Sequence, residues 1–211
     1  MIAKLSLDKI VQMIGSTPEQ SVFDWKRTFT PPRDDAAKGE FVKDVMAVAN
    51  GTAFTRLPGF VLYGVNADSP DPFVGVAERW DDNEAQALVR GALDPVPDFL
   101  YYEVLAGDDR VVGVVHIEPK GGFFIVTRDL GRLREGQCLL RQGSTTRGVR
   151  RADLIKLYLT PGYGYAEQLL QQYGAAAAMT NAQTARLQQL DRMQQQLVRH
   201  MYASVGLPPP F

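Results

Sequence analysis

The chain has 211 residues, of which 45% are hydrophobic and 22% are charged, and its formal net charge is −1. This composition is typical of a soluble globular protein and excludes an intrinsically disordered chain. No apolar run approaches the ~20 residues that cross a bilayer, and the amino-terminal stretch lacks a long apolar core followed by a small-residue cleavage site, so we expect a cytoplasmic protein.

Cysteine and histidine are too few to build a structural metal site. The single cysteine, Cys138, excludes an intrachain disulfide and a cysteine-rich zinc site. The two histidines, His116 and His200, lie far apart in the sequence and cannot supply the remaining zinc ligands. A structural metal is therefore not expected.

Two interpretations compete for the amino-terminal part of the chain. Apolar residues at three- and four-residue steps predict a helix over residues 5–14. Ser16 and Glu19 then have the spacing of a capping box that begins a second helix, whereas residues 22–26 alternate as a strand does. The two patterns conflict, and the sequence alone leaves both open.

The strand interpretation places two charged side chains together. In an extended segment alternate side chains point to opposite faces, so Asp24 and Lys26 share one face while Phe23 and Trp25 share the other. We therefore expect the side chains of Asp24 and Lys26 to project together.

Residues 41–50 predict the helix around which the rest of the chain is organised. Apolar side chains at three- and four-residue steps give this helix one buried face, while Lys43 and Asp44 stay on its solvent-exposed side. Asn50 and Gly51 are expected to end it, because both residues tolerate the left-handed conformation of a helix end.

An apolar segment over residues 59–65 predicts a strand that is covered on both faces. Asn66 follows it, where the strand opens into a loop. Asp81 and Asp82 precede a predicted helix, at the amino end where the helix dipole favours acidic residues. Further strands are predicted in chain order over residues 73–77, 99–105, 110–118, 123–127 and 137–141, the last two continuing the sheet.

The carboxyl-terminal part of the chain is predicted to be helical over residues 150–159 and again over residues 175–202. The apolar side chains of the second helix form a narrow stripe, which is typical of a helix that packs against one partner, either this chain's own core or a second copy. We predict a domain over residues 1–160 and a helical extension over residues 161–211 that forms a homo-oligomer through residues 175–203.

Charge is distributed unevenly along the chain. Residues 66–109 contain eleven Asp and Glu and two Arg, whereas residues 128–160 contain eight Lys and Arg and three acids. This asymmetry predicts one negative and one positive surface, the second able to bind a polyanion or to pair with the first on another copy. The alternative is that both segments are merely solvated faces.

Four short motifs occur in order over roughly residues 16–160. The string KDVMAVAN, followed by GFVLYGVN, resembles the core of the AlbA-like domain found in Schlafen proteins and in prokaryotic proteins labelled divergent AAA or putative transcriptional regulators. Upstream, FDWK is similar to the family's "E-F-K", and downstream LRQGST is similar to its "hydrophobic-R-x-G-S-S/T". The resemblance implies an α+β fold, a mixed β-sheet covered by helices, followed here by the carboxyl-terminal helical extension.

The resemblance also implies a function, namely binding of nucleic acid, RNA or DNA, in regulation or defence. Nuclease members of the family hold Mg²⁺ or Mn²⁺ with carboxylates, and the matching positions here are Glu19, Asp24 and Asn66, with Lys26 as the oxyanion-stabilising lysine. Asn66 is a departure, because a neutral amide is a weaker Mg²⁺ ligand than a carboxylate; Asp68 is the possible substitute. We therefore expect cleavage to be lost, and a metal-dependent endoribonuclease is the alternative.

A second group of residues predicts phosphate binding. Arginines surround a hydroxyl-rich segment that we expect at a strand-to-helix junction, where backbone N–H groups point at anions. Binding through such residues would be non-specific in sequence and sensitive to salt. The predicted nucleic-acid-binding residues are Arg128, Arg132, Arg134, Arg141, Gly143, Ser144, Thr145, Arg147, Arg150 and Arg151.

Three further alternatives stay open. The sequence contains no GxxxxGK[ST] motif, so ATP hydrolysis is not expected, while weak nucleotide binding is left open. The chain could also act as an oligomeric scaffold through its long helix, without nucleic acid. The arginines themselves could be structural, with Arg141 simply ending a strand above a glycine turn.

Overall fold

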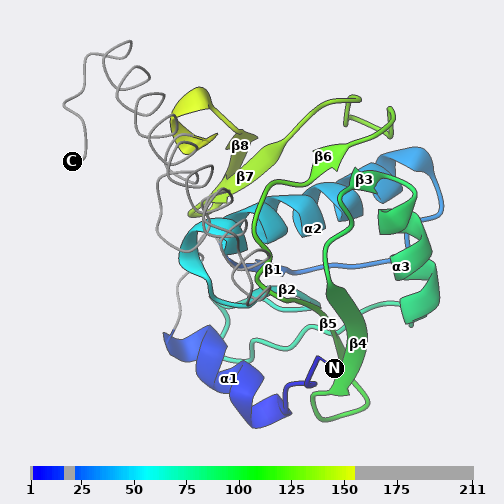
Figure 1. The fold of residues 1–211 in the computed structure, drawn as a ribbon. Coiled ribbons are helices and arrows are strands. Elements are labelled where there is room, and N and C mark those ends of the chain that lie inside the picture. The colour runs from blue at the N-terminus through cyan, green and yellow to red at the C-terminus, as the bar shows by residue number, and fades with distance from the viewer. Residues whose placement is uncertain (1, 17–21, 155–211) are drawn as a thin grey trace, which may run out of the picture. The chain divides into compact units, whose positions relative to one another are not determined.

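The structure is a computed structural model that describes residues 2–16 and 22–154 (Figure 1). The chain divides into two units, Met1–Leu157 and Tyr158–Phe211. The second unit, with the helix predicted over residues 175–202 and its role in self-association, lies outside the described residues, and so does Glu19. The elements in chain order are α1 (Leu7–Ser16), β1 (Phe23–Lys26), α2 (Asp35–Thr55), β2 (Gly59–Tyr63), α3 (Asp82–Arg90), β3 (Leu93–Asp94), β4 (Phe99–Leu105), β5 (Val111–Ile117), β6 (Ile125–Val126), β7 (Leu139–Gln142) and β8 (Thr145–Gly148).

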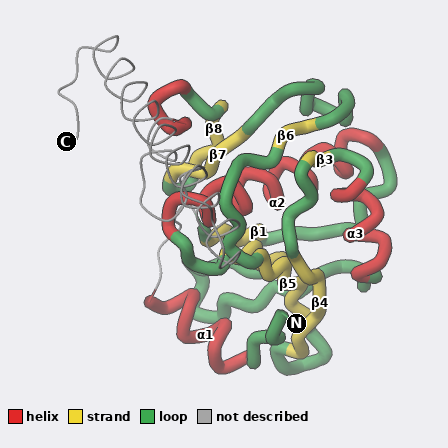
Figure 2. The backbone as a smooth tube through the Cα atoms, in the orientation of Figure 1, coloured by secondary structure: helices red, strands yellow, loops and turns green. Residues whose placement is uncertain are grey.

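A mixed four-stranded sheet forms the centre of the described domain, in the order β1-β2-β5-β4. β1 runs parallel to β2, whereas β5 is antiparallel to both β2 and β4. The parallel register sets Asp24 beside Val61 and Lys26 beside Tyr63. With helices on this mixed sheet, the fold class is α+β, as the sequence predicts (Figure 2).

The sheet is covered on both faces. Val61 and Tyr63 of β2 belong to the larger hydrophobic core, which they share with α2 and α3. Leu62 of β2 and Phe23 of β1 point the other way, into a smaller core with Ile10 of α1. Because side chains alternate along a strand, this arrangement leaves Asp24 and Lys26 on the face that α2 covers. The prediction that β2 is covered on both sides is confirmed.

Helix α2 differs from the expected helix at its end and on its polar side. It begins after Asp34, whose side chain accepts a hydrogen bond from the Ala37 N–H, and it continues past Asn50 to Thr55, with Arg56 in the left-handed conformation. The prediction that Asn50 ends the helix is wrong, because the buried Asn50 side chain bonds to other segments instead. The prediction that Asp44 faces solvent is also wrong, since Asp44 is 7% exposed.

Two predicted strand arrangements are wrong. β6 pairs with β3 and β7 pairs with β8, so neither extends the central sheet. Residues 73–77 form one β-bridge, between Phe73 and Val65, instead of a strand. Two segments of backbone approach closely there, since the N–H groups of Val74 and Gly75 both donate to the Gly64 carbonyl. Gly64 has φ 80°, and a Cβ on it would lie 2.5 Å from the carbonyl carbon of Gly75, so only glycine allows this close approach.

Several local predictions are confirmed. Residues 23–26 are a strand, and Ser16 is the last residue of α1 instead of the cap of a second helix. Asp81 caps α3 by accepting a hydrogen bond from the Asn83 N–H, and β4 and β5 form the expected hairpin. Within the described residues, no helix combines the length and the apolar character that a membrane span needs.

Candidate functional site

Three elements that are far apart in the sequence bring charged side chains to one place. Asp24 of β1 is 1% exposed and Arg141 of β7 is 4% exposed, and the Arg141 Nη2 lies 2.7 Å from the Asp24 Oδ1. The Nζ of Lys26 lies 3.0 Å from the Asp24 Oδ2 and 3.4 Å from the Asp44 Oδ1 on α2. Asp24, Lys26, Asp44 and Arg141 are called the charge cluster below. Its members satisfy the general rule that buried charges are paired.

The sequence explains part of the charge cluster. Residue alternation in β1 predicts that Asp24 and Lys26 project together, and their ion pair confirms it. Asp44 was missed, although a signal existed. Residues 41–49 are apolar except for Lys43 and Asp44, and so many apolar residues indicate a helix segment that is buried on most sides. The contact between Asp24 and Arg141 left no local signal, because 117 residues separate the two positions.

Burial and pairing oppose each other in setting the protonation of the cluster. Burial raises the pKa of Asp44 to about 6, although the neighbouring Lys26 and Lys43 act to lower it. Burial by itself lowers the pKa of Lys26, but the carboxylates of Asp44 and Asp24 outweigh this effect, so its pKa is raised. Lys26 is therefore an ammonium at neutral pH, suited to binding an anion and unsuited to acting as a base or a nucleophile.

The described side chains do not fit a divalent metal. Both carboxylate oxygens of Asp24 already face cations, and a metal ion would have to displace the Lys26 ammonium from between Asp24 and Asp44. Across residues 2–16 and 22–154, no three His, Cys, Asp or Glu side chains are grouped so that they could hold a metal. The metal site expected at Glu19, Asp24 and Asp68 stays a prediction, because Glu19 is not among these residues.

Asn66 lies in the loop after β2, where the sequence placed it. Its backbone closes this loop, since the Asn66 N–H donates to the Pro72 carbonyl at 2.8 Å and its own carbonyl accepts from the Ser69 N–H at 3.1 Å. Asp68 is exposed in the same loop. The backbone of Asn66 therefore stabilises the turn after β2.

An open cleft of about 590 Å³ lies beside the charge cluster. β1, α2, β7, β8 and the loop before β7 supply its walls. Among the described residues, Glu40 is the one carboxylate in this lining, and Ser144 and Thr146 add hydroxyl groups. We call it the basic cleft, after its five cationic side chains. These are Lys26, Lys43, Arg132, Arg141 and Arg147.

The structure divides the predicted nucleic-acid-binding residues into two groups. Arg132, Arg141, Ser144 and Arg147 line the basic cleft. The others are not among its lining residues. These are Arg128, whose Nε donates to the Gly91 carbonyl at 2.9 Å, Arg134, which contacts Gly131 and Asp129 of its own loop, and Gly143, Thr145, Arg150 and Arg151.

The hydroxyl-rich segment is a hairpin between β7 and β8, so the expected strand-to-helix junction is wrong. Its turn has Gly143 at φ 60°, and the Thr145 hydroxyl donates to the Gln142 carbonyl. Hydroxyl groups therefore stabilise the turn of a hairpin instead of capping a helix.

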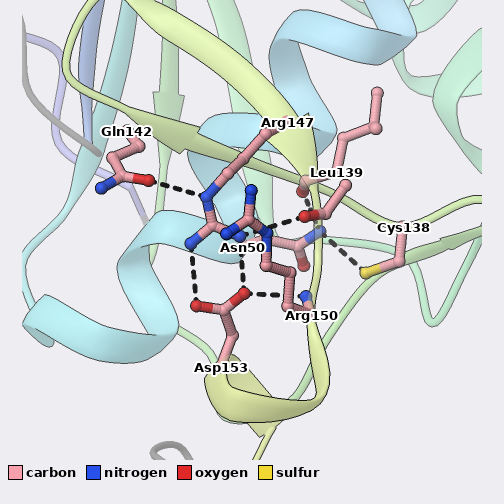
Figure 3. Close-up of polar contacts among 8 residues, drawn as sticks. Asn50, Cys138, Leu139, Gln142, Arg147, Arg150 and Asp153 are labelled. Atoms are coloured by element: carbon pink, nitrogen blue, oxygen red, sulfur yellow. Dashed lines mark hydrogen bonds and ion pairs between the residues drawn. The ribbon is translucent and has the colours of Figure 1, made fainter.

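Arg147 is held by the chain's own acid. Both of its terminal nitrogens donate to the carboxylate of Asp153, at 2.6 and 2.8 Å, and its Nε donates to Gln142 at 2.7 Å (Figure 3). Arg141 is likewise paired with Asp24. The lysines are paired as well, Lys26 with Asp24 and Asp44, and Lys43 with Glu40 and Asp44. The charge available to a ligand in the basic cleft therefore comes chiefly from Arg132, which is exposed.

Asn50 fixes the wall of the basic cleft to α2. Its Nδ2 donates to the Leu139 carbonyl at 2.6 Å (Figure 3). Its Oδ1 accepts from the Phe124 N–H at 2.7 Å. Leu139 begins β7, which packs against α2 and contains Arg141. The amide that the sequence suggested as a helix end is therefore the buried anchor that positions the cleft.

Comparison with known proteins adds little to this description. No family model matches the sequence, and no curated protein matches it. Among solved structures, the chain is similar to the crystal structure of the DIP2311 protein from Corynebacterium diphtheriae, with a TM-score of 0.47 and 16% sequence identity. The similarity covers 73% of this chain and 28% of that chain. Membership of the Schlafen AlbA-like family stays a prediction.

Proposed function

We propose that the described domain binds nucleic acid, RNA or DNA, through the phosphate backbone, with the basic cleft as the binding site. The observation that carries this proposal is the lining of that cleft, where, among the residues that the structure describes, five cationic and two hydroxyl side chains meet one carboxylate. Lys, Arg, Ser and Thr side chains are the usual partners of nucleic-acid phosphates. Phosphates are common to RNA and DNA, so the cleft by itself does not distinguish the two.

The charge cluster prepares the cleft for this role. Asp24 holds both Lys26 and Arg141 in place, so these side chains lose little conformational freedom when an anion binds. The same carboxylate, with Asp44, offsets part of their charge. We therefore expect weak, sequence-independent binding, with a dissociation constant on the order of 10⁻⁵ M at physiological salt.

Salt and charge reversal test the proposal. If about three phosphates contact the cleft, affinity for a mixed-sequence single strand should fall about 20-fold between about 50 and 200 mM salt, because bound counterions are released. Arg132→Glu and Lys43→Glu should each weaken binding about 10-fold at the lower salt, since each reverses a charge that faces the phosphates. Fluorescence anisotropy of a labelled strand measures both effects.

Arg128→Glu is the matched control, because it makes the same charge change in the same arginine-rich segment but outside the cleft. It should leave affinity within about twofold of the wild type, since that position does not face the bound phosphates. Equal losses for Arg128→Glu and Arg132→Glu would show that overall charge, and not the cleft, sets the affinity. Binding that does not depend on salt would contradict phosphate recognition.

A further inference from the structure

A second, smaller cleft of about 280 Å³ opens next to the basic cleft. Lys26 and Glu40 line both, so the two clefts meet at these side chains. Phe29, Phe41 and Tyr63 line the smaller cleft with the small parts of their side chains that stay exposed, and we call it the aromatic pocket. It therefore offers apolar surface directly beside the place proposed for phosphates.

Polar groups also line the aromatic pocket, among them the carboxylates of Glu40, which pairs with Lys43, and of Asp44, which pairs with Lys26. The Tyr63 hydroxyl is buried, and within the described residues it has no hydrogen-bond partner. Buried hydroxyls almost always have a partner, so this one on a pocket-lining residue is open to a hydrogen bond with a water molecule or a bound ligand. The carboxylates of Glu40 and Asp44 are hydrogen-bond acceptors in the same lining.

We infer that the aromatic pocket holds one unpaired nucleobase of the strand whose phosphates occupy the basic cleft. This inference rests on the proposed function and adds a substrate class to it, single-stranded nucleic acid. A base is planar and apolar on its faces, which suits a wall of aromatic side chains, and its edge carries hydrogen-bonding groups. A base and its own phosphate are covalent neighbours, which matches two clefts that share Lys26 and Glu40.

The carboxylates select the kind of base. A carboxylate accepts hydrogen bonds from an exocyclic amino group, as Asp and Glu do from cytosine. Uracil and thymine have no amino group, and their carbonyl oxygens would face the carboxylates. The pocket therefore favours amino-bearing bases such as cytosine.

The test compares strands that share a backbone and differ in their bases. Labelled oligocytidine, oligouridine and an abasic strand of the same length are titrated at one low salt concentration. The wild-type protein should bind oligocytidine about 10-fold more tightly than the abasic strand, because base stacking adds to backbone binding. Oligouridine should lie close to the abasic strand.

Ala37→Phe blocks the pocket without touching the basic cleft, because Ala37 lines the first and not the second. It should abolish the advantage of oligocytidine and leave the abasic affinity unchanged. Ala36→Phe is the matched control, an exposed neighbour on α2 that does not line the pocket, and it should keep the advantage. Tyr63→Phe removes only the hydroxyl and should reduce the advantage several-fold, with a folded protein expected since that hydroxyl has no described partner.

The outcomes separate this inference from the proposed function. Equal binding of oligocytidine and the abasic strand by the wild type would overturn the inference and leave backbone binding intact. If no strand binds, the proposed function fails, and a titration with free cytidine then tests base binding in the aromatic pocket by itself. The Trp80 ring lies 4.8 Å from that of Phe41, so its fluorescence reports on the pocket. Saturable quenching by cytidine but not by uridine would support base binding in the pocket. The absence of quenching would overturn the inference.

Discussion

Replacing Asn50 with Asp should lower the free energy of unfolding by about 3–5 kcal/mol at neutral pH, the usual effect of leaving a charge buried without a partner. Asn50 is 0% exposed, and its Nδ2 donates to the carbonyls of Leu139 and Phe124. Asp has nearly the same shape but no N–H group, so a carboxylate oxygen would face those carbonyls. The substitution creates no cavity, so its cost comes from the buried charge and from the lost hydrogen bonds of Nδ2.

Urea unfolding followed by tryptophan fluorescence measures this effect. Asn83→Asp is the matched control, since Asn83 is exposed in the first turn of α3, where the helix dipole favours an acid, and the change should be within about 0.5 kcal/mol of zero. Burial raises the pKa of the new carboxyl at position 50 above its unfolded value. Its protonated form is therefore favoured in the folded state, and the deficit should shrink as pH falls. A loss below about 1 kcal/mol would contradict the anchoring role of Asn50.

Lys26→Met should cost about 3 kcal/mol of folding free energy at pH 7, because it removes the cation between two buried carboxylates. Asp24 keeps its contact with Arg141, so the main effect falls on Asp44, whose remaining described ion pair is with Lys43 at 3.9 Å. Met has a similar length, so the loss of packing is small. Thermal unfolding of the variant and the wild type measures the difference.

The effect of Lys26→Met should depend on pH in a defined direction. The pKa of Asp44 is already raised to about 6 by burial, and without the lysine it rises further. A carboxyl whose folded pKa exceeds its unfolded value contributes stability below the unfolded pKa and loses it as pH rises through the folded pKa. The deficit should therefore be larger at pH 7, decrease as pH falls toward about 6, and reach its minimum below that pH, where Asp44 is protonated in both proteins.

A second substitution identifies the residue responsible. Asp44→Asn in the Lys26→Met background should restore much of the lost stability, since it removes the uncompensated charge. Lys38→Met is the matched control, because it makes the same substitution at a lysine that pairs with Asp35 at the surface of α2. It should cost below about 1 kcal/mol of folding free energy. Equal costs for Lys26→Met and Lys38→Met would contradict the account of the charge cluster.

Local pattern was enough to predict several elements and one contact. The amino-terminal cap of α3 and the turn of the β4–β5 hairpin each depend on residues within a few positions of one another, so the sequence specifies them directly. The pairing of Asp24 with Lys26 follows from the two-residue repeat of a strand. The α+β class follows from the number and order of such local elements.

The tertiary structure decided which of these residues matter together. The local pattern of its helix predicts that Asp44 faces solvent, and only the packing of α2 on β2 and β7 buries it beside Lys26. Asn50 was assigned to a helix end because that is its local preference, whereas its partners lie 74 and 89 residues further along the chain. The arginines are close in sequence, yet Arg132 faces the basic cleft and Arg128 faces the end of α3. A side chain's partners depend on the path of the whole chain, and that path is not contained in the few residues around it.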